Sequence, residues 1–106
     1  MDDLAFLNEL FAEIEARRAA APDTSYSAQL LADLPRAARK LGEEASETMV
    51  AALSGTDEAL AGEAGDLLYR LLVVLVARGV TLDQLTDVLA ARAGTSGLDE
   101  KAARDA

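Results

Sequence analysis

The residues best suited to chemistry are five acids in two short stretches of the chain. The stretch "KLGEEASETMVAAL" holds Glu43, Glu44 and Glu47, and "GEAGDLLYRLLVVLVARG" holds Glu63 and Asp66. Residues three apart on a helix point the same way, so the two acids of each such pair can reach a shared ion. If the two helices are antiparallel neighbours, the pairs Glu44 with Glu47 and Glu63 with Asp66 face each other across the interface.

Four carboxylates brought this close need a counter-charge, because burial and like-charge proximity both raise carboxylate pKa values. Mg²⁺ accepts oxygen ligands and keeps several waters, which suits an acidic cluster that binds a di- or triphosphate. The alternative is an ordinary solvated face, where Glu43 and Glu58 add solubility and Lys40 pairs with Glu44 for about 0.3 kcal/mol. Two acidic pairs on adjacent helices favour the metal site.

The apolar residues before these acids recur at helical spacing. Leu4, Leu7, Phe11 and Ile14 predict a first helix that ends around Ala20. "APDTSYS" then indicates a loop, because turn-forming residues cluster where the periodicity stops. A short turn of helix follows in "AQLLAD". This N-terminal part is therefore expected to pack on the longer helices behind it.

Two longer helices carry the acids. Pro35 suits the first position of a helix that runs to about Leu53, and Gly55 suits a left-handed position after its end. Thr56 can cap the next helix, which runs to about Arg78. The short connection between them predicts a helical hairpin.

The C-terminal part continues the helical pattern and then becomes polar. Gly79 ends the third long pattern and Thr81 can cap a fourth helix. That helix carries Leu82, Leu85, Val88 and Leu89. No strand-like alternation appears, so we predict an all-α fold, a four- to five-helix bundle. Residues 1–93 form one domain, and 94–106 form a polar tail that we expect to be poorly ordered.

Composition excludes several classes of function. The 106 residues include 19 acids and 10 bases, and the formal charge of -9 repels nucleic acid and anionic membranes. Cysteine and histidine are both absent, which excludes thiolate and imidazole catalysis and zinc-thiolate sites. The N-terminus lacks the features of a secretory signal, and "LLVVLVA" is too short to span a bilayer. We expect a cytoplasmic protein with no nucleic acid and no membrane partner. The negative charge does not exclude a small phosphorylated substrate, because a divalent cation held by the acids can invert the local field.

The two acidic stretches also resemble a known motif. "EEASE", followed after one short loop by "EAGD", is similar to the Glu-Glu-x-x-Glu and Glu-x-x-Asp motif of the all-α nucleoside triphosphate pyrophosphatase superfamily, which has the MazG-like fold. The longer strings "SYSAQLL", "KLGEEASETMVAAL" and "EAGDLLYRLLVVLVARGVTLDQL" resemble the phosphoribosyl-ATP pyrophosphatase family over roughly Leu4 to Arg92. The resemblance implies Mg²⁺-dependent hydrolysis of phosphoribosyl-ATP to phosphoribosyl-AMP and pyrophosphate, the second step of histidine biosynthesis, by a homodimer or homotetramer.

The same resemblance assigns roles to the acids. It implies that the metal ligands are Glu44, Glu47, Glu63 and Asp66. It also implies that Glu43, the first acid of the motif, is close enough to orient a water or a second ion. The family is often written with a histidine after the Leu-Leu-Tyr of the second motif, where this chain has Arg70.

Other residues are candidates for catalysis and substrate binding. Without histidine, the base must be a carboxylate or a metal-bound hydroxide, and Glu43 or Glu47 is the candidate. Lys40 lies one helical turn before Glu44 and is the best-placed cation for phosphate oxygens. Tyr26, in the loop before the second helix, can stack on a base or cover a ribose, or can plug the end of the bundle. Three arginines are further candidates, Arg36, Arg39 and Arg70.

Two other interpretations stay open. A house-cleaning pyrophosphatase that acts on a noncanonical nucleoside triphosphate would share the metal motif, and a noncatalytic helical dimerisation module would share the apolar faces. We expect self-association, because the helix around "LLYRLLVVLV" is apolar nearly all round. Four further side chains are predicted to lie in the core, Phe6, Phe11, Met49 and Tyr69.

Overall fold

The computed structural model describes residues 3–93 and 97–105. Within this part of the chain there are six helices and no strand. The helices are α1 (Asp3–Ala16), α2 (Tyr26–Leu31), α3 (Leu34–Ser54), α4 (Asp57–Arg78), α5 (Leu82–Arg92) and α6 (Gly97–Asp105). The predicted all-α class is confirmed, whereas the number of helices exceeds the predicted four to five. No helix among the described residues combines the length and the apolar character needed to cross a membrane.

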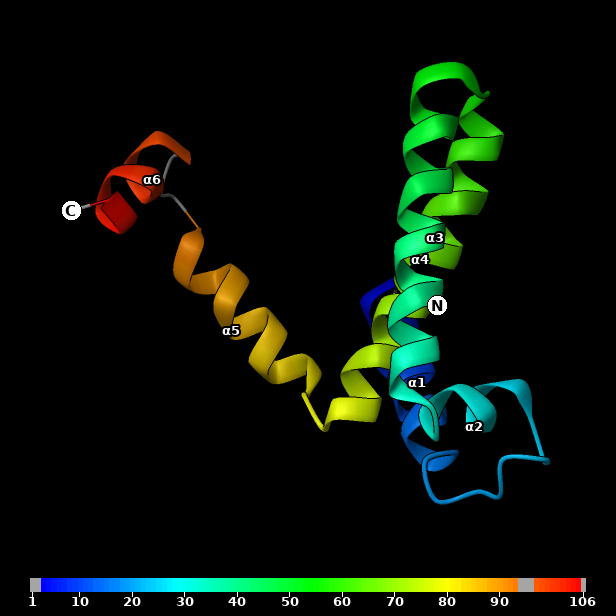
Figure 1. The fold of residues 1–106 in the computed structure, drawn as a ribbon. Coiled ribbons are helices and arrows are strands. Elements are labelled where there is room, and N and C mark those ends of the chain that lie inside the picture. Colours follow the sequence, from blue (N-terminus) through cyan, green and yellow to red (C-terminus); the bar gives the residue numbers. More distant parts are fainter. Residues whose placement is uncertain (1–2, 94–96, 106) are drawn as a thin grey trace.

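The helices α3 and α4 form a long antiparallel hairpin that extends from the rest of the molecule (Figure 1). The Asp33 carboxylate caps α3 by accepting a hydrogen bond from the backbone N–H of Arg36, and Pro35 lies in the first turn. The Thr56 hydroxyl caps α4 by accepting from the N–H of Ala59. These local signals explain why both helices begin and end close to the predicted residues.

The two glycines that follow these helices differ in conformation. Gly79 has a φ of 75° and ends α4 in the left-handed region. Gly55 has a φ of -98° and a ψ of -179°, so the predicted left-handed conformation is wrong there. The connection holds only Gly55 and Thr56, and Gly55 must be extended to lead directly into the next cap. A Cβ at Gly55 would lie 2.9 Å from the Ala51 carbonyl oxygen, so close packing favours glycine at this position.

The core lies at the base of the hairpin, where α1 and α2 pack on α4 and α2 also packs on α3. Its buried side chains are Phe11, Ile14, Leu30, Ala37, Leu72, Val73 and Val76. Phe11 is thus in the core as predicted, and Tyr69 packs against the core. Phe6 and Met49 are 51% and 59% exposed, so their predicted core positions are wrong. Helical periodicity identifies an apolar face, but it does not say which element covers that face.

The ends of the chain agree with the sequence analysis at the Thr81 cap and differ from it in the end of α1 and in the helix α6. α1 ends at Ala16 rather than around Ala20, because the backbone N–H groups of Arg17 and Arg18 donate to carbonyls three residues back in a tighter turn. α5 begins at a capping box formed by Thr81 and Gln84 and extends away from the hairpin without a buried side chain (Figure 1). The described part of the tail is the helix α6, where the sequence analysis assigns none.

Candidate active site

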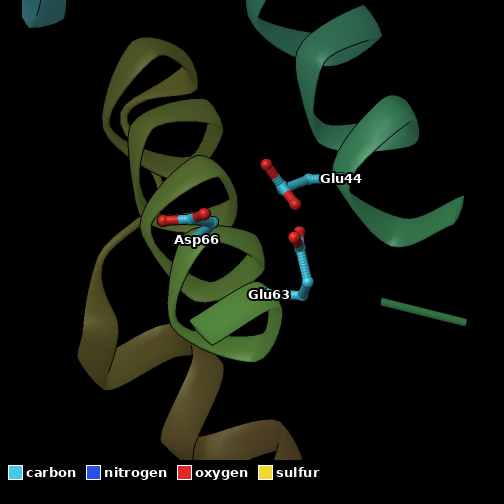
Figure 2. Close-up of side chains that lie close together, drawn as sticks. All are labelled: Glu44, Glu63 and Asp66. Carbon is cyan, nitrogen blue, oxygen red and sulfur yellow. The ribbon is translucent and has the colours of Figure 1, made fainter. Parts of the chain in front are cut away.

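Three acids meet where α3 faces α4 (Figure 2). Glu44 comes from α3, and Glu63 and Asp66 come from adjacent turns of α4. One carboxylate oxygen of each acid lies within 4.8 Å of the others. Glu44 and Glu63 are half-buried, and Asp66 is exposed. The antiparallel hairpin therefore brings together three of the four acids that the sequence analysis groups as metal ligands.

Thr48 joins the two helices at the level of these acids. Its hydroxyl lies 2.8 Å from the backbone carbonyl of Glu44 and 3.2 Å from the carbonyl of Glu63. A hydroxyl carries one hydrogen, so this donor is shared between the two carbonyls. The contact fixes the distance between the backbones that carry the facing carboxylates. The sequence analysis does not identify Thr48 as part of the site. The feature that could have identified it is a hydroxyl side chain one turn after Glu44, on the side of α3 that packs against α4.

The carboxylates of Glu44 and Glu63 are incompletely satisfied. Oε2 of each is shielded from solvent and has no hydrogen-bond partner among the described residues. A shielded carboxylate oxygen without a partner costs free energy, because it has lost hydration without a replacement. A proton shared between the two acids, or a bound cation, removes this cost. An all-oxygen donor set of this kind fits a hard divalent cation such as Mg²⁺.

The electrostatics at Glu44 agree with this geometry. The pKa of Glu44 is raised to about 7, mainly because its protonated form can donate a hydrogen bond to Glu63, then because of burial, and then because of the neighbouring carboxylate of Glu47. Without a cation, Glu44 therefore keeps a proton up to a pH close to neutral. A cation that binds between Glu44 and Glu63 must displace that proton.

Glu47 and Glu43, the two candidate bases, lie in different surroundings. Glu47 is exposed and close enough to Glu44 to raise its pKa, but it lies outside the group of three acids. Glu43 forms an ion pair with Lys40, with Oε2 and Nζ 3.4 Å apart. The pair of Lys40 with Glu44 that the solvated-face alternative requires is absent from the described residues, because Glu44 faces Glu63 instead.

An open cavity of about 400 Å³ adjoins the acids at the far end of the hairpin. Its lining residues are Ser46, Glu47, Val50, Ala51, Ser54, Gly55, Ala59 and Glu63. Glu47 and Glu63 thus contribute to the lining of a space large enough for part of a nucleotide.

A second polar group surrounds Tyr26, the first residue of α2 rather than a loop residue. Arg70 Nη1 donates a hydrogen bond to the phenol oxygen at 3.3 Å. The guanidinium carbons of Arg70 and Arg36 lie 5.3 Å and 5.6 Å from the ring centroid. The hydrogen bond from Arg70 is the largest cause of the lowered pKa of Tyr26, burial opposes it, and the charge of Lys40 adds to it. The structure therefore brings Tyr26, Arg70 and Lys40, the three predicted substrate-binding residues, into one neighbourhood.

A neighbouring contact holds α2 on the hairpin. The Ser27 hydroxyl and the Tyr69 phenol form a hydrogen bond between α2 and α4. Tyr69 is half-buried against the core, and the Arg70 guanidinium lies 5.9 Å from its ring centroid. The position of Tyr26 beside the hairpin is thus fixed by the residue that follows it.

The sequence was compared with the models of known protein families. The family described as phosphoribosyl-ATP pyrophosphohydrolase matches residues 7–93. The chain belongs to this family. The matched span of this chain includes every acid of the site and also the Tyr26 group, which consists of Tyr26, Arg36, Lys40 and Arg70. It ends just after α5, so α6 lies outside it.

Individual relatives agree with the family match. The chain is 59% identical over 99 residues to the phosphoribosyl-ATP pyrophosphatase of Erythrobacter litoralis (strain HTCC2594). The alignment covers 92% of this chain and 95% of that protein. The chain is 55% identical over 98 residues to the phosphoribosyl-ATP pyrophosphatase of Caulobacter sp. (strain K31), with 92% of each chain covered. For the protein of that name from Cereibacter sphaeroides (strain ATCC 17029 / ATH 2.4.9), identity is 51% over 102 residues, or 95% of this chain and 99% of the other.

Proposed function

We infer that the chain hydrolyses phosphoribosyl-ATP to phosphoribosyl-AMP and pyrophosphate in histidine biosynthesis. Membership of the family over residues 7–93 and the names of the relatives support this activity. The observation that carries the proposal is the group of Glu44, Glu63 and Asp66, whose oxygens lie within 4.8 Å of one another inside that span. The same support favours an enzyme over a noncatalytic dimerisation module. A cytoplasmic location belongs to the proposal, because the substrate is a free nucleotide of amino-acid biosynthesis.

The cofactor in this proposal is Mg²⁺, held by Glu44, Glu63 and Asp66 with Glu47 beside them as the fourth carboxylate. The shielded oxygens of Glu44 and Glu63, which lack hydrogen-bond partners among the described residues, support the fit. When bound, the ion neutralises charge on the departing pyrophosphate and lowers the pKa of a coordinated water. The facing acids supply oxygen ligands from two helices, and Thr48 keeps those helices at a fixed separation.

Hydrolysis requires a base that accepts a proton from the attacking water. The water oxygen forms a bond to phosphorus, the bridging bond between the α and β phosphates breaks, and pyrophosphate leaves. Of the two candidate bases, Glu47 has the better position, because it lines the cavity beside Glu63 and carries no ion pair among the described residues. Glu43 is held by Lys40 on the exposed side of α3, and we assign it to orienting water through that pair.

The substrate-binding residues in this proposal are Lys40, Tyr26 and Arg70. All three lie near the core end of the hairpin, whereas the cavity lies at the other end of the acidic group. Lys40 and Arg70 each stand one helical turn from an acid of the site, Glu44 and Asp66 respectively. A substrate held by the acids is therefore within reach of both cations.

The active form in this proposal is a homodimer or a larger homo-oligomer. Several large apolar side chains of the hairpin are exposed, and Leu53, Met49 and Val50 reach 82%, 59% and 57%. All three lie on α3, and their exposure shows that the described chain leaves them uncovered. The hairpin that carries them extends beyond the other helices (Figure 1). A second copy that packs along this face would bury them.

The activity is tested by measuring pyrophosphate release from phosphoribosyl-ATP, ATP, deoxy-ATP and noncanonical nucleoside triphosphates at saturating Mg²⁺. We expect kcat/KM for phosphoribosyl-ATP to exceed the others by about a hundredfold or more. Glu58→Gln, a change at an exposed acid in the first turn of α4, is the matched control and should leave this preference intact. Equal or faster turnover of a noncanonical triphosphate would assign the house-cleaning activity instead.

A further inference from the structure

The faces of α3 and α4 that meet in the hairpin are divided by charge along its length. On α3, Arg36 and Lys40 precede Glu44 at steps of four residues, and on α4, Arg70 follows Asp66 by four. A step of four residues is about 6 Å along a helix and returns to nearly the same face. Because the helices run antiparallel, the three cations lie toward the same end, beyond the acids. Along the facing sides of α3 and α4, the acids therefore lie toward the tip of the hairpin and the cations lie toward the core.

Two of these cations lack an acidic partner. Neither Arg36 nor Arg70 has a carboxylate within ion-pair distance among the described residues, although the chain carries 19 acids. Both are half-buried and both stand over the ring of Tyr26, at 5.6 Å and 5.3 Å from its centroid. Both guanidiniums therefore lie beside one aromatic ring, which attracts cations but carries no charge that neutralises them. Such an arrangement creates a local positive charge in a strongly acidic chain.

The chemistry of this group suits a phosphate. A guanidinium presents a planar set of N–H donors that matches two phosphate oxygens, and two guanidiniums together balance a dianion. The Tyr26 oxygen accepts a hydrogen bond from Arg70 at 3.3 Å, which leaves its own O–H to donate to a phosphate oxygen. A carboxylate ligand is the alternative, but a phosphate monoester better uses all these donors, because it carries close to two charges near neutral pH.

The substrate of the proposed reaction has phosphates at two ends. The triphosphate must reach the metal-binding acids, because the bond that breaks lies between its α and β phosphates. The other phosphate is the monoester of the phosphoribosyl arm, which the acids would repel. This phosphate therefore needs cations at a distance from the acids. Arg70 lies one helical turn from Asp66, and Arg36 lies two helical turns from Glu44.

We propose that Arg36, Arg70 and the phenol of Tyr26 bind the phosphate monoester of the phosphoribosyl arm, and so select phosphoribosyl-ATP over ATP. This inference rests on the proposed function and deepens it, since it names the residues that recognise the part of the substrate that ATP lacks. It also adds Arg36 to the substrate-binding residues.

The test compares two ligands that differ only in that arm, phosphoribosyl-AMP and AMP, by calorimetry with the full chain. Wild type should bind phosphoribosyl-AMP more tightly than AMP. Arg36→Gln and Arg70→Gln should each weaken phosphoribosyl-AMP by about tenfold or more and leave AMP unchanged, because a charge-assisted hydrogen bond is lost. Tyr26→Phe, which keeps the ring and removes one donor, should give a smaller loss in the same direction. Arg78→Gln, in the last turn of α4, is the matched control, and it should bind both ligands as wild type does.

Three results would overturn the proposal. Equal binding of phosphoribosyl-AMP and AMP by wild type would show that the arm is not recognised. A third titration, with ATP, locates the bound phosphate: weaker ATP binding with unchanged phosphoribosyl-AMP binding in Arg70→Gln would assign the group to the terminal phosphates. A lower thermal midpoint with unchanged ligand preference would make the group purely structural. Failure of the proposed function is a separate result, because it appears as absent pyrophosphate release by the wild type.

Discussion

The carboxylates of Glu44 on α3 and Glu63 on α4 face each other across the hairpin, and each has one shielded oxygen without a hydrogen-bond partner among the described residues. This relationship gives the site its electrostatic character. Two acids in this position repel each other when both are ionised, so the metal-free protein must hold a proton or pay a free-energy cost. The first prediction follows from that choice.

We expect the metal-free protein to lose stability as the pH rises. The pKa of Glu44 is about 7 in the folded chain against an ordinary value of 4.5. The folded state therefore binds a proton more tightly than the unfolded chain. The stability contributed by this group is complete below the ordinary pKa and is lost as the pH rises through the folded pKa. Thermal midpoints in a chelator from about pH 5 to about pH 8 should fall for wild type.

The matched variants identify the group responsible. Glu44→Gln keeps the shape and removes the titration, so its midpoint should depend less on pH than that of wild type. Glu58→Gln should retain the slope of wild type. A slope that is the same in wild type and Glu44→Gln would show that the facing pair does not hold the proton.

Glu47 should act mainly on the chemical step. Glu47→Gln removes the proposed base but leaves the three acids that lie within 4.8 Å of one another. We expect kcat to fall by about a hundredfold or more, with a smaller change in the Mg²⁺ concentration that gives half-maximal activity. Steady-state kinetics over a range of Mg²⁺ concentrations measures both quantities. A large rise in the required Mg²⁺ with nearly unchanged kcat would make Glu47 a ligand and not a base.

The extent of prediction from sequence differs between features of the fold. The limits of α3 and α4 could be predicted because Pro35, Thr56 and Gly79 act on their immediate neighbours. The meeting of Glu44 with Glu63 could be predicted because a two-residue connection leaves the helices little choice but to run antiparallel. Both features depend on short stretches of chain.

Other features depend on contacts that a linear pattern does not record. The hydrogen bond between Arg70 and Tyr26 joins residues 44 positions apart, and it requires α2 to fold back on α4. Met49 has the apolar character of a core residue, but it lies on a face that no described helix of the same chain covers. The sequence pattern supplies the apolar face, and the assembly decides whether that face is buried.

Self-association is the third prediction. Leu53 is 82% exposed on α3, near the end of the hairpin farthest from the core. Leu53→Asp should shift the protein from an oligomer to a monomer, because a charge cannot be buried in an apolar interface without a partner. Sedimentation velocity at micromolar concentration measures the change. Ala19→Asp, at an exposed position after α1, should leave the oligomer intact. A wild-type protein that is already monomeric under these conditions would exclude the proposed interface.

The fourth prediction concerns the tail. The family match ends at residue 93, and the described side chains of α6 are exposed. A chain that stops after Ala93 should therefore keep kcat/KM for phosphoribosyl-ATP within about twofold of the full chain. The circular dichroism spectrum of both forms checks that the rest of the fold is preserved. A large loss of activity with a preserved fold would mean that α6 takes part in the site.

The central claim is that the acids shared between α3 and α4 hold the divalent cation used to hydrolyse phosphoribosyl-ATP, and Glu63→Gln tests it most directly. This change keeps the shape of the side chain and removes one ligand charge. Phosphoribosyl-ATP turnover should be measured across Mg²⁺ concentrations for wild type, Glu63→Gln and the surface control Glu58→Gln. We predict that kcat/KM falls by about a hundredfold or more in Glu63→Gln, with more Mg²⁺ needed for half-maximal activity, while Glu58→Gln matches wild type. Wild-type turnover and an unchanged Mg²⁺ requirement in Glu63→Gln would contradict the claim.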